Sequence, residues 1–109
     1  MTFLEYRILV TIEAQHQAAQ DDPEPAKWQK WDHREWEIDR EFNRRYSPRW
    51  FGPAAASEAG RVRHLRAIRR LGDEGILEIL RGDAGKLERV RLTDKGYEAM
   101  EAVEERSLA

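Results

Sequence analysis

The sequence contains no cysteine and no long apolar run, and each absence excludes a class of protein or site. Without cysteine, neither disulfides nor thiolate metal sites can form. No apolar stretch approaches the roughly 18 residues of a membrane-spanning helix, and the amino terminus lacks the basic-then-apolar pattern of a signal peptide. We therefore expect a cytoplasmic protein with no membrane partner.

A large net charge is also absent, since the formal value for 109 residues is −2. The distribution is nevertheless uneven, because nine arginines lie between Arg40 and Arg70 against two glutamates. Such asymmetry is typical of a basic binding face on an otherwise acidic body. The length and the 40% hydrophobic content allow one small domain over residues 1–109.

The first half of the chain predicts two helices separated by a loop. Residues 1–20 form the first, with Thr2 as a plausible N-cap, and the proline-containing segment 21–25 forms the loop. Residues 26–46 form a Trp-rich helix, on which Trp36 lies off an apolar stripe made of Trp28, Trp31, Ile38, Phe42 and Tyr46. A break follows at 47–53, where Trp50 or Phe51 is expected to anchor the loop in the core.

The next predicted helix, over residues 54–74, is the most informative part of the chain. Its apolar positions recur every three residues, and arginine fills most of the others. One side is expected to consist of Val62, Leu65, Ile68 and Leu71, and the other of Arg63, Arg66 and Arg70. No acidic residue lies between Glu58 and Asp73, so the helix does not neutralise itself as salt-bridged surface helices do. The alternative interpretation is that the arginine side of this helix is an ordinary solvated surface, neutralised by carboxylates from other elements.

The remainder predicts a β-hairpin over 76–92 and a closing helix over 93–107. Gly75 suits the left-handed residue after a helix, residues 82–86 form the turn, and Thr93 caps the last helix. The fold class is therefore mostly α with a β-hairpin, in the order α-α-α-β-β-α.

Two motifs in this order resemble winged helix-turn-helix regulators, particularly the small MarR-like and PadR-like types. The segment Leu65-Arg66-Ala67-Ile68-Arg69-Arg70-Leu71-Gly72-Asp73-Glu74-Gly75-Ile76-Leu77 is similar to the end of their recognition helix. The segment Val90-Arg91-Leu92-Thr93-Asp94-Lys95-Gly96 is similar to the Leu-Thr-x-x-Gly that follows their wing. The chain differs in having a long Trp-rich helix and a proline-bounded loop where these families have a short helix and a tight turn. The resemblance implies a winged helix-turn-helix that binds double-stranded DNA and regulates transcription.

Arginine suits such a role because its planar fork matches guanine O6 and N7 and also pairs with phosphates. Arg63 and Arg66 are the candidates for base edges. Contacts from the hairpin are implied by the wing of the family. The complete set of expected DNA-binding residues is Ser57, Arg61, Arg63, Arg66, Arg69, Arg70, Arg81, Lys86 and Arg89.

A homodimer is also expected, because three amphipathic helices offer more apolar surface than one small core absorbs. The residues expected to face a partner are Leu4, Ile8, Ile12, Trp36, Met100 and Val103. We expect no enzymatic activity, cofactor or metal, since the histidines are scattered and no nucleophile is paired with a base. Two further functions stay open: an interaction module that meets an acidic protein, and a weakly specific nucleoid or replication-associated DNA binder.

Overall fold

The structure is a computed structural model that describes residues 1–108, and it is mostly helical with a two-stranded antiparallel hairpin. Its elements in chain order are helix α1 (Phe3–Asp21), helix α2 (Lys30–Glu41), the 3-10 helix η1 (Pro48–Ala55), helix α3 (Glu58–Asp73), strand β1 (Leu77–Arg81), the 3-10 turn η2 (Asp83–Gly85), strand β2 (Leu87–Leu92) and helix α4 (Asp94–Leu108). The predicted class and order are confirmed, and η1 is an additional element. Among residues 1–108, no helix is long and apolar enough to cross a membrane.

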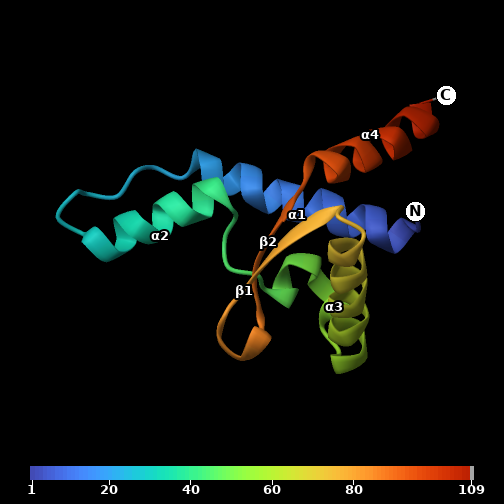
Figure 1. Ribbon diagram of the computed structural model, residues 1–109, viewed down its shortest axis with the longest axis horizontal. Helices are drawn as coiled ribbons and strands as arrows, with labels where there is room; N and C mark the ends of the chain where they lie inside the picture. The colour runs from blue at the N-terminus through green and yellow to red at the C-terminus, as the bar shows by residue number, and fades with distance from the viewer. Residues whose placement is uncertain (109) are drawn as a thin grey trace.

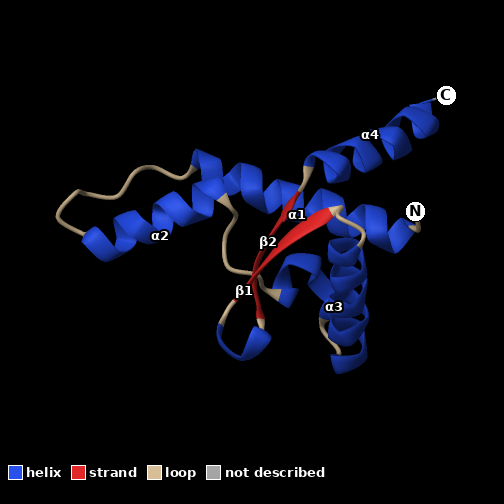
Figure 2. Cartoon of the chain, viewed as in Figure 1, coloured by secondary structure: helices blue, strands red, loops and turns tan. Residues whose placement is uncertain are grey.

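Helix α1 runs through the middle of the molecule, with α4 above it, η1 and α3 below it and the hairpin crossing it in the view of Figures 1 and 2. It begins at Thr2, whose hydroxyl accepts a hydrogen bond from the Glu5 N–H while the Glu5 carboxylate accepts one from the Thr2 N–H. This capping box satisfies two orphan amides and confirms the predicted N-cap. The buried face of α1 forms the centre of the core, through Ile8, Leu9, Ile12 and Ala19.

Helix α2 is shorter than the predicted helix over 26–46 and spans Lys30–Glu41. It ends because Asn43 takes a positive φ of 148°, which a helix does not allow. The Asn43 amide is fully buried and donates to the Ile12 carbonyl at 3.2 Å and to the Val90 carbonyl at 3.1 Å. The chain then runs beside β2, where the Tyr46 N–H donates to the Glu88 carbonyl at 2.8 Å. A buried side-chain amide that joins α1 to β2 therefore replaces the last helical turns.

The predicted aromatic stripe of this helix is wrong at its outer end. Trp28 is 80% exposed and Trp31 is 70% exposed, and no residue of α2 is buried. The helix projects from the body, as Figure 1 shows, so its outer turns have no second layer to cover them. Trp36 is half-buried, as expected for a residue off the stripe, and its indole N–H donates to the Asp22 carbonyl at 3.0 Å.

The predicted loop anchor is confirmed in η1. Phe51 is buried there and packs on His64 of α3 with ring centroids 4.6 Å apart. Trp50 is half-buried and meets the ring of Tyr46 edge-on at 5.5 Å. The aromatic side chains thus hold η1 against the base of α3.

The hairpin pairs Leu77 with Leu92 and Ile79 with Val90, which places alternate apolar side chains on the core face. Helix α4 follows, and the Thr93 hydroxyl accepts the Gly96 N–H at 3.1 Å in the predicted capping position. Hydrogen bonds from tyrosines to glutamates attach α4 to α1, from Tyr97 to Glu13 at 2.6 Å and from Tyr6 to Glu104 at 3.2 Å.

Candidate nucleic-acid interface

Helix α3 is fixed at both ends as its sequence predicts, within narrower bounds than 54–74. Ser57 is its N-cap, and its hydroxyl accepts the Gly60 N–H at 3.0 Å. Gly75 follows the carboxyl end with a φ of 76°, a conformation that glycine adopts without strain. The Ser57 hydroxyl is thus already engaged within the protein.

The apolar side of α3 differs from the expected one. Its buried residues are Gly60, His64, Ala67, Ile68 and Leu71, which follow the three-and-four spacing of a helix face. Val62 is 39% exposed and Leu65 is half-buried, so a strict three-residue repeat drifts off the core. The reason is the helical period of about 3.6 residues. The exposed valine lies among the arginines.

The arginines of α3 point to solvent and are barely neutralised. Within residues 1–108, Arg63, Arg66 and Arg69 form no ion pair or side-chain hydrogen bond. Arg70 has only a contact of 4.0 Å to the Glu5 carboxylate, and Arg61 donates to the Ala56 carbonyl at 3.1 Å. The face is therefore a concentrated positive charge with free donors.

A groove of about 610 Å³ lies between the amino end of α1 and the arginine side of α3. Its apolar lining comes from Leu4, Ala59, Val62 and Ala67, and its arginines are Arg63, Arg66 and Arg70. These three arginines therefore share one side of α3, as predicted. Glu58 is the acidic residue at this groove.

The tip of the hairpin carries two more exposed cations, Lys86 and Arg81. Lys86 follows η2, where Ala84 and Gly85 take left-handed φ values of 59° and 74°. Arg81 is exposed and donates to the Gly85 carbonyl at 3.3 Å, which keeps it close to the turn. In the view of Figure 1, the hairpin tip and the start of α3 lie at the same lower edge of the molecule.

The prediction that Arg89 contacts DNA is wrong. Its side chain is 1% exposed and is enclosed by α2: it pairs with Glu35 at 2.8 Å and with the Asp39 carboxylate, and it donates to the Asn43 carbonyl at 2.6 Å. The residue lies on the side of β2 that faces α2, so it cannot reach a ligand. Its function is to attach α2 to the hairpin.

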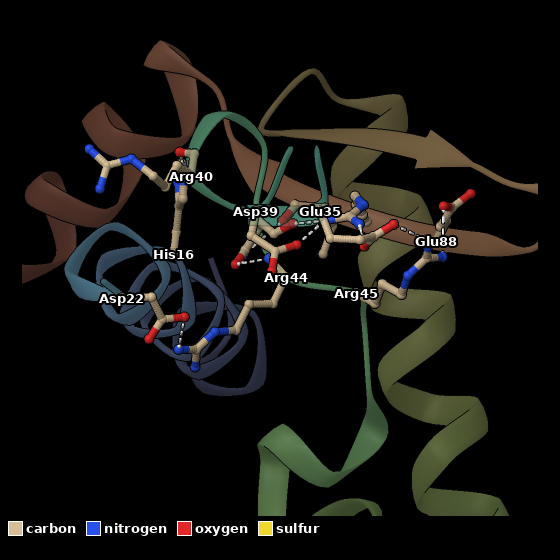
Figure 3. A network of polar contacts seen from close by, with 11 residues as sticks. His16, Asp22, Glu35, Asp39, Arg40, Arg44, Arg45 and Glu88 are labelled. Carbon is tan, nitrogen blue, oxygen red and sulfur yellow. Dashed lines mark hydrogen bonds and ion pairs between the residues drawn. The ribbon is translucent and has the colours of Figure 1, made fainter. Parts of the chain in front are cut away.

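Figure 3 shows the polar network to which Glu35 and Asp39 belong. Arg45 donates to Glu35 at 3.0 Å and to Glu88 at 2.9 Å. The hydrogen bond from Arg45, with added attraction from Arg89, holds the pKa of Glu35 below its usual value. Arg44 pairs with Asp22 at 2.8 Å, and the His16 ring lies 2.9 Å from the Arg40 carbonyl. Arg44 and Arg45 are thus neutralised by carboxylates, unlike Arg63, Arg66 and Arg69 of α3.

The expected partner-facing residues separate into two groups. Ile8 and Ile12 are fully buried in the core, so their assignment to a dimer interface is wrong. Leu4, Trp36, Met100 and Val103 are half-buried. The sequence interpretation missed Phe3, which is 76% exposed, and Val10, which is 38% exposed. Their seven-residue spacing places them on one side of α1, a signal that the sequence already contained.

Comparisons of this chain with protein-family models, curated proteins and solved structures found no match. Its function has to be inferred from the residues and their arrangement.

Proposed function

We propose that this protein binds double-stranded DNA sequence-specifically and regulates transcription, as a winged helix-turn-helix of the MarR-like and PadR-like kind. In this proposal η1 and α3 are the two helices of the helix-turn-helix, and residues 56–57 form the turn between them. Helix α3 enters the major groove, and the hairpin is the wing. The element order supports this assignment, as does the hairpin tip, which lies at the same edge of the molecule as the start of α3 in the view of Figure 1.

The main support for this proposal is the contrast between two sets of arginines. Arg44, Arg45 and Arg89 are paired with carboxylates at 2.8–3.0 Å, whereas Arg63, Arg66 and Arg69 have no such partner among residues 1–108. A folded protein gains little from leaving several like charges on one helix face without counter-charges. DNA supplies the missing negative charge as phosphates and the matching acceptors as guanine edges.

The arrangement also suggests a division of work among these residues. Arg63 and Arg66 are the candidates for base edges, because they lie in the middle of the exposed face. Arg61, Arg69 and Arg70 are candidates for phosphates. Ser57 caps the helix, so its contribution to DNA binding is the orientation of the first turn, whose amides favour an anion.

A selection from random duplexes followed by binding measurements tests the proposal. We expect Arg63→Ala/Arg66→Ala to weaken binding to the selected duplex by at least about tenfold and to relax base preference, since each bidentate contact is worth about 1–3 kcal/mol. The matched control is Arg106→Ala, which removes an exposed arginine from α4 and should leave binding unchanged. Equal affinity of the double variant and the wild type for the selected duplex would show that α3 is not a recognition helix.

An acidic protein is the second candidate partner, and the apolar lining of the groove favours it. Leu4 and Val62 beside three arginines fit an amphipathic acidic helix. The two candidates differ in their response to Leu4→Gln, which should weaken a protein partner and leave duplex binding intact. They differ also in salt dependence, which is steep for a ligand that displaces counterions from several phosphates.

We further propose that the protein is a homodimer, held by the outer side of α1 and by α4. Phe3 and Val10 give α1 an exposed apolar side. Met100 and Val103 of α4 are half-buried, so part of each side chain is free to contact a second copy. A two-fold dimer would set two copies of α3 about 34 Å apart, one turn of DNA.

A further inference from the structure

The end of the projecting arm, residues 27–34, exposes more aromatic surface than folding explains. Trp28 is 80% exposed and Trp31 is 70% exposed, although tryptophan is the side chain that gains most from burial. Neither ring belongs to the core or to the α3 surface, and Figure 1 places the arm and α3 at opposite ends of the molecule. Adjacent exposed apolar side chains of this size indicate an interaction surface.

The charge left free at this arm tip is positive. The acidic side chains further along the arm are engaged: Glu24 and Glu37 lie 2.8 and 3.3 Å from the two ring nitrogens of His33, and Glu35 and Asp39 hold Arg89. Within residues 1–108, the exposed cations Lys27, Lys30 and Arg34 have no ion-pair partner. Asp32 is the exposed acid beside them, which leaves an excess of positive charge at the tip.

The cations and the aromatic rings alternate in a fixed order. The segment Lys27-Trp28-Gln29-Lys30-Trp31 repeats a cation followed by a tryptophan after three residues. Lys27 and Trp28 lie in the turn before α2, closed by the Gln29 N–H on the Ala26 carbonyl at 2.9 Å, and Lys30 and Trp31 lie in the first turn of the helix. A hollow of about 220 Å³ lies between Lys27, Lys30 and His33. The tip thus offers, within five consecutive residues, two exposed tryptophan rings and two lysines that have no ion-pair partner in the described part of the chain.

This pattern matches the chemistry of an unpaired nucleotide chain. Each nucleotide has one flat base and one phosphate, and base stacking on aromatic side chains beside a cationic path is how single strands are held without sequence preference. A duplex hides its base faces within the stack, so it offers no faces to the two rings.

We propose that the arm tip binds single-stranded nucleic acid, with Trp28 and Trp31 stacking on successive bases and Lys27, Lys30 and Arg34 contacting the phosphates. This site is separate from α3 and does not depend on the duplex-binding proposal. A protein with both sites would hold a duplex at one end and an unpaired strand at the other.

Binding of a short labelled oligothymidine, measured by fluorescence anisotropy, tests the site. We expect the wild type to bind at low salt with quenching of its tryptophan fluorescence, and Trp28→Ala/Trp31→Ala to lose at least about tenfold in affinity. Lys27→Gln/Lys30→Gln should weaken binding and flatten its salt dependence. These side chains are exposed, so circular dichroism should show an unchanged fold.

Two controls separate this site from the rest of the molecule. Arg106→Gln, which removes an exposed cation from α4, should bind the oligonucleotide like the wild type. Arg63→Ala/Arg66→Ala should also retain oligothymidine binding, whatever its effect on duplex binding.

Four results would overturn the proposal. The first is no binding of oligothymidine by the wild type at low salt, and the second is equal binding by the tryptophan double variant. The third is loss of oligothymidine binding in Arg63→Ala/Arg66→Ala, which would locate single-strand binding on α3. The fourth is that the tryptophan substitutions leave oligothymidine binding intact but change another property. A changed mass in light scattering would assign the rings to a contact with a second copy, and changed binding to anionic vesicles would assign them to a membrane.

Discussion

At the residue scale, arginine performs two different tasks in this protein. Arg89 is enclosed and paired with Glu35 and Asp39, which stand 54 and 50 positions away in the chain. Arg66 is exposed and has no such partner among residues 1–108. Local sequence around the two residues does not distinguish them, because the neutralising carboxylates come from a distant element. Burial and partners decide which arginine is structural.

The first stability prediction concerns this buried arginine. Arg89→Met should lower the free energy of unfolding by about 3 kcal/mol, because it leaves Asp39 and the Asn43 carbonyl without their buried donor and Glu35 with Arg45 alone. Urea unfolding followed by circular dichroism gives the value. Arg44→Met is the matched control: the Arg44–Asp22 pair is 35% and 45% exposed, so its loss should cost no more than about 1 kcal/mol. Equal losses in the two variants would contradict the structural role of Arg89.

At the element scale, close backbone contact between η1 and α3 sets the geometry of the candidate interface. Gly60 lies in the first turn of α3 and is buried against η1. A Cβ at this position would overlap the carbonyl of Ala54, a backbone group that cannot turn aside. The absence of a side chain therefore lets the two helices approach each other.

Gly60→Ala tests this contact. Alanine is a better helix former than glycine by about 1 kcal/mol, so local propensity alone predicts stabilisation. We expect the opposite, a loss of thermal stability and of duplex affinity, because η1 must shift away from α3. Gly72→Ala is the comparison, since the atom nearest to its new Cβ is the flexible end of the Ile79 side chain, 2.6 Å away. A more stable Gly60→Ala protein would show that the approach of the two helices is not tight.

At the scale of the whole molecule, charge is separated across α1. Helix α3, which carries the arginines, lies on one side of α1, and α4 lies on the other, as Figure 1 shows. Helix α4 exposes Glu98, Glu101 and Glu105. A net charge of −2 thus conceals a molecule with one basic and one acidic side, which would orient it toward a polyanion.

The proposed dimer leads to the prediction at this scale. Phe3→Ser/Val10→Ser should convert the dimer to a monomer of 12.8 kDa, because the substitutions remove both apolar side chains from the outer side of α1. Light scattering during size-exclusion chromatography measures the mass. Trp28→Ala/Trp31→Ala is the control and should remain dimeric. A wild-type mass near 12.8 kDa across the peak at micromolar concentration would refute the dimer.

Elements with local signals could be predicted from the amino-acid sequence. The caps at Thr2, Ser57 and Thr93, the left-handed Gly75 and the two hairpin strands follow from residues that lie within a few positions of one another. The arginine side of α3 was also predictable, because the lack of acidic residues between Glu58 and Asp73 is visible in the chain.

Features that depend on partners far away in the chain could not be predicted in this way. The buried Asn43 amide ends α2 early because it bonds to Ile12 and Val90, and no periodicity reveals that contact. The exposure of Trp28 and Trp31 depends on the lack of a second layer over α2, and the burial of Arg89 depends on where Glu35 and Asp39 lie. A helical period indicates which side chains share a side, but the packing of other elements decides which side is covered.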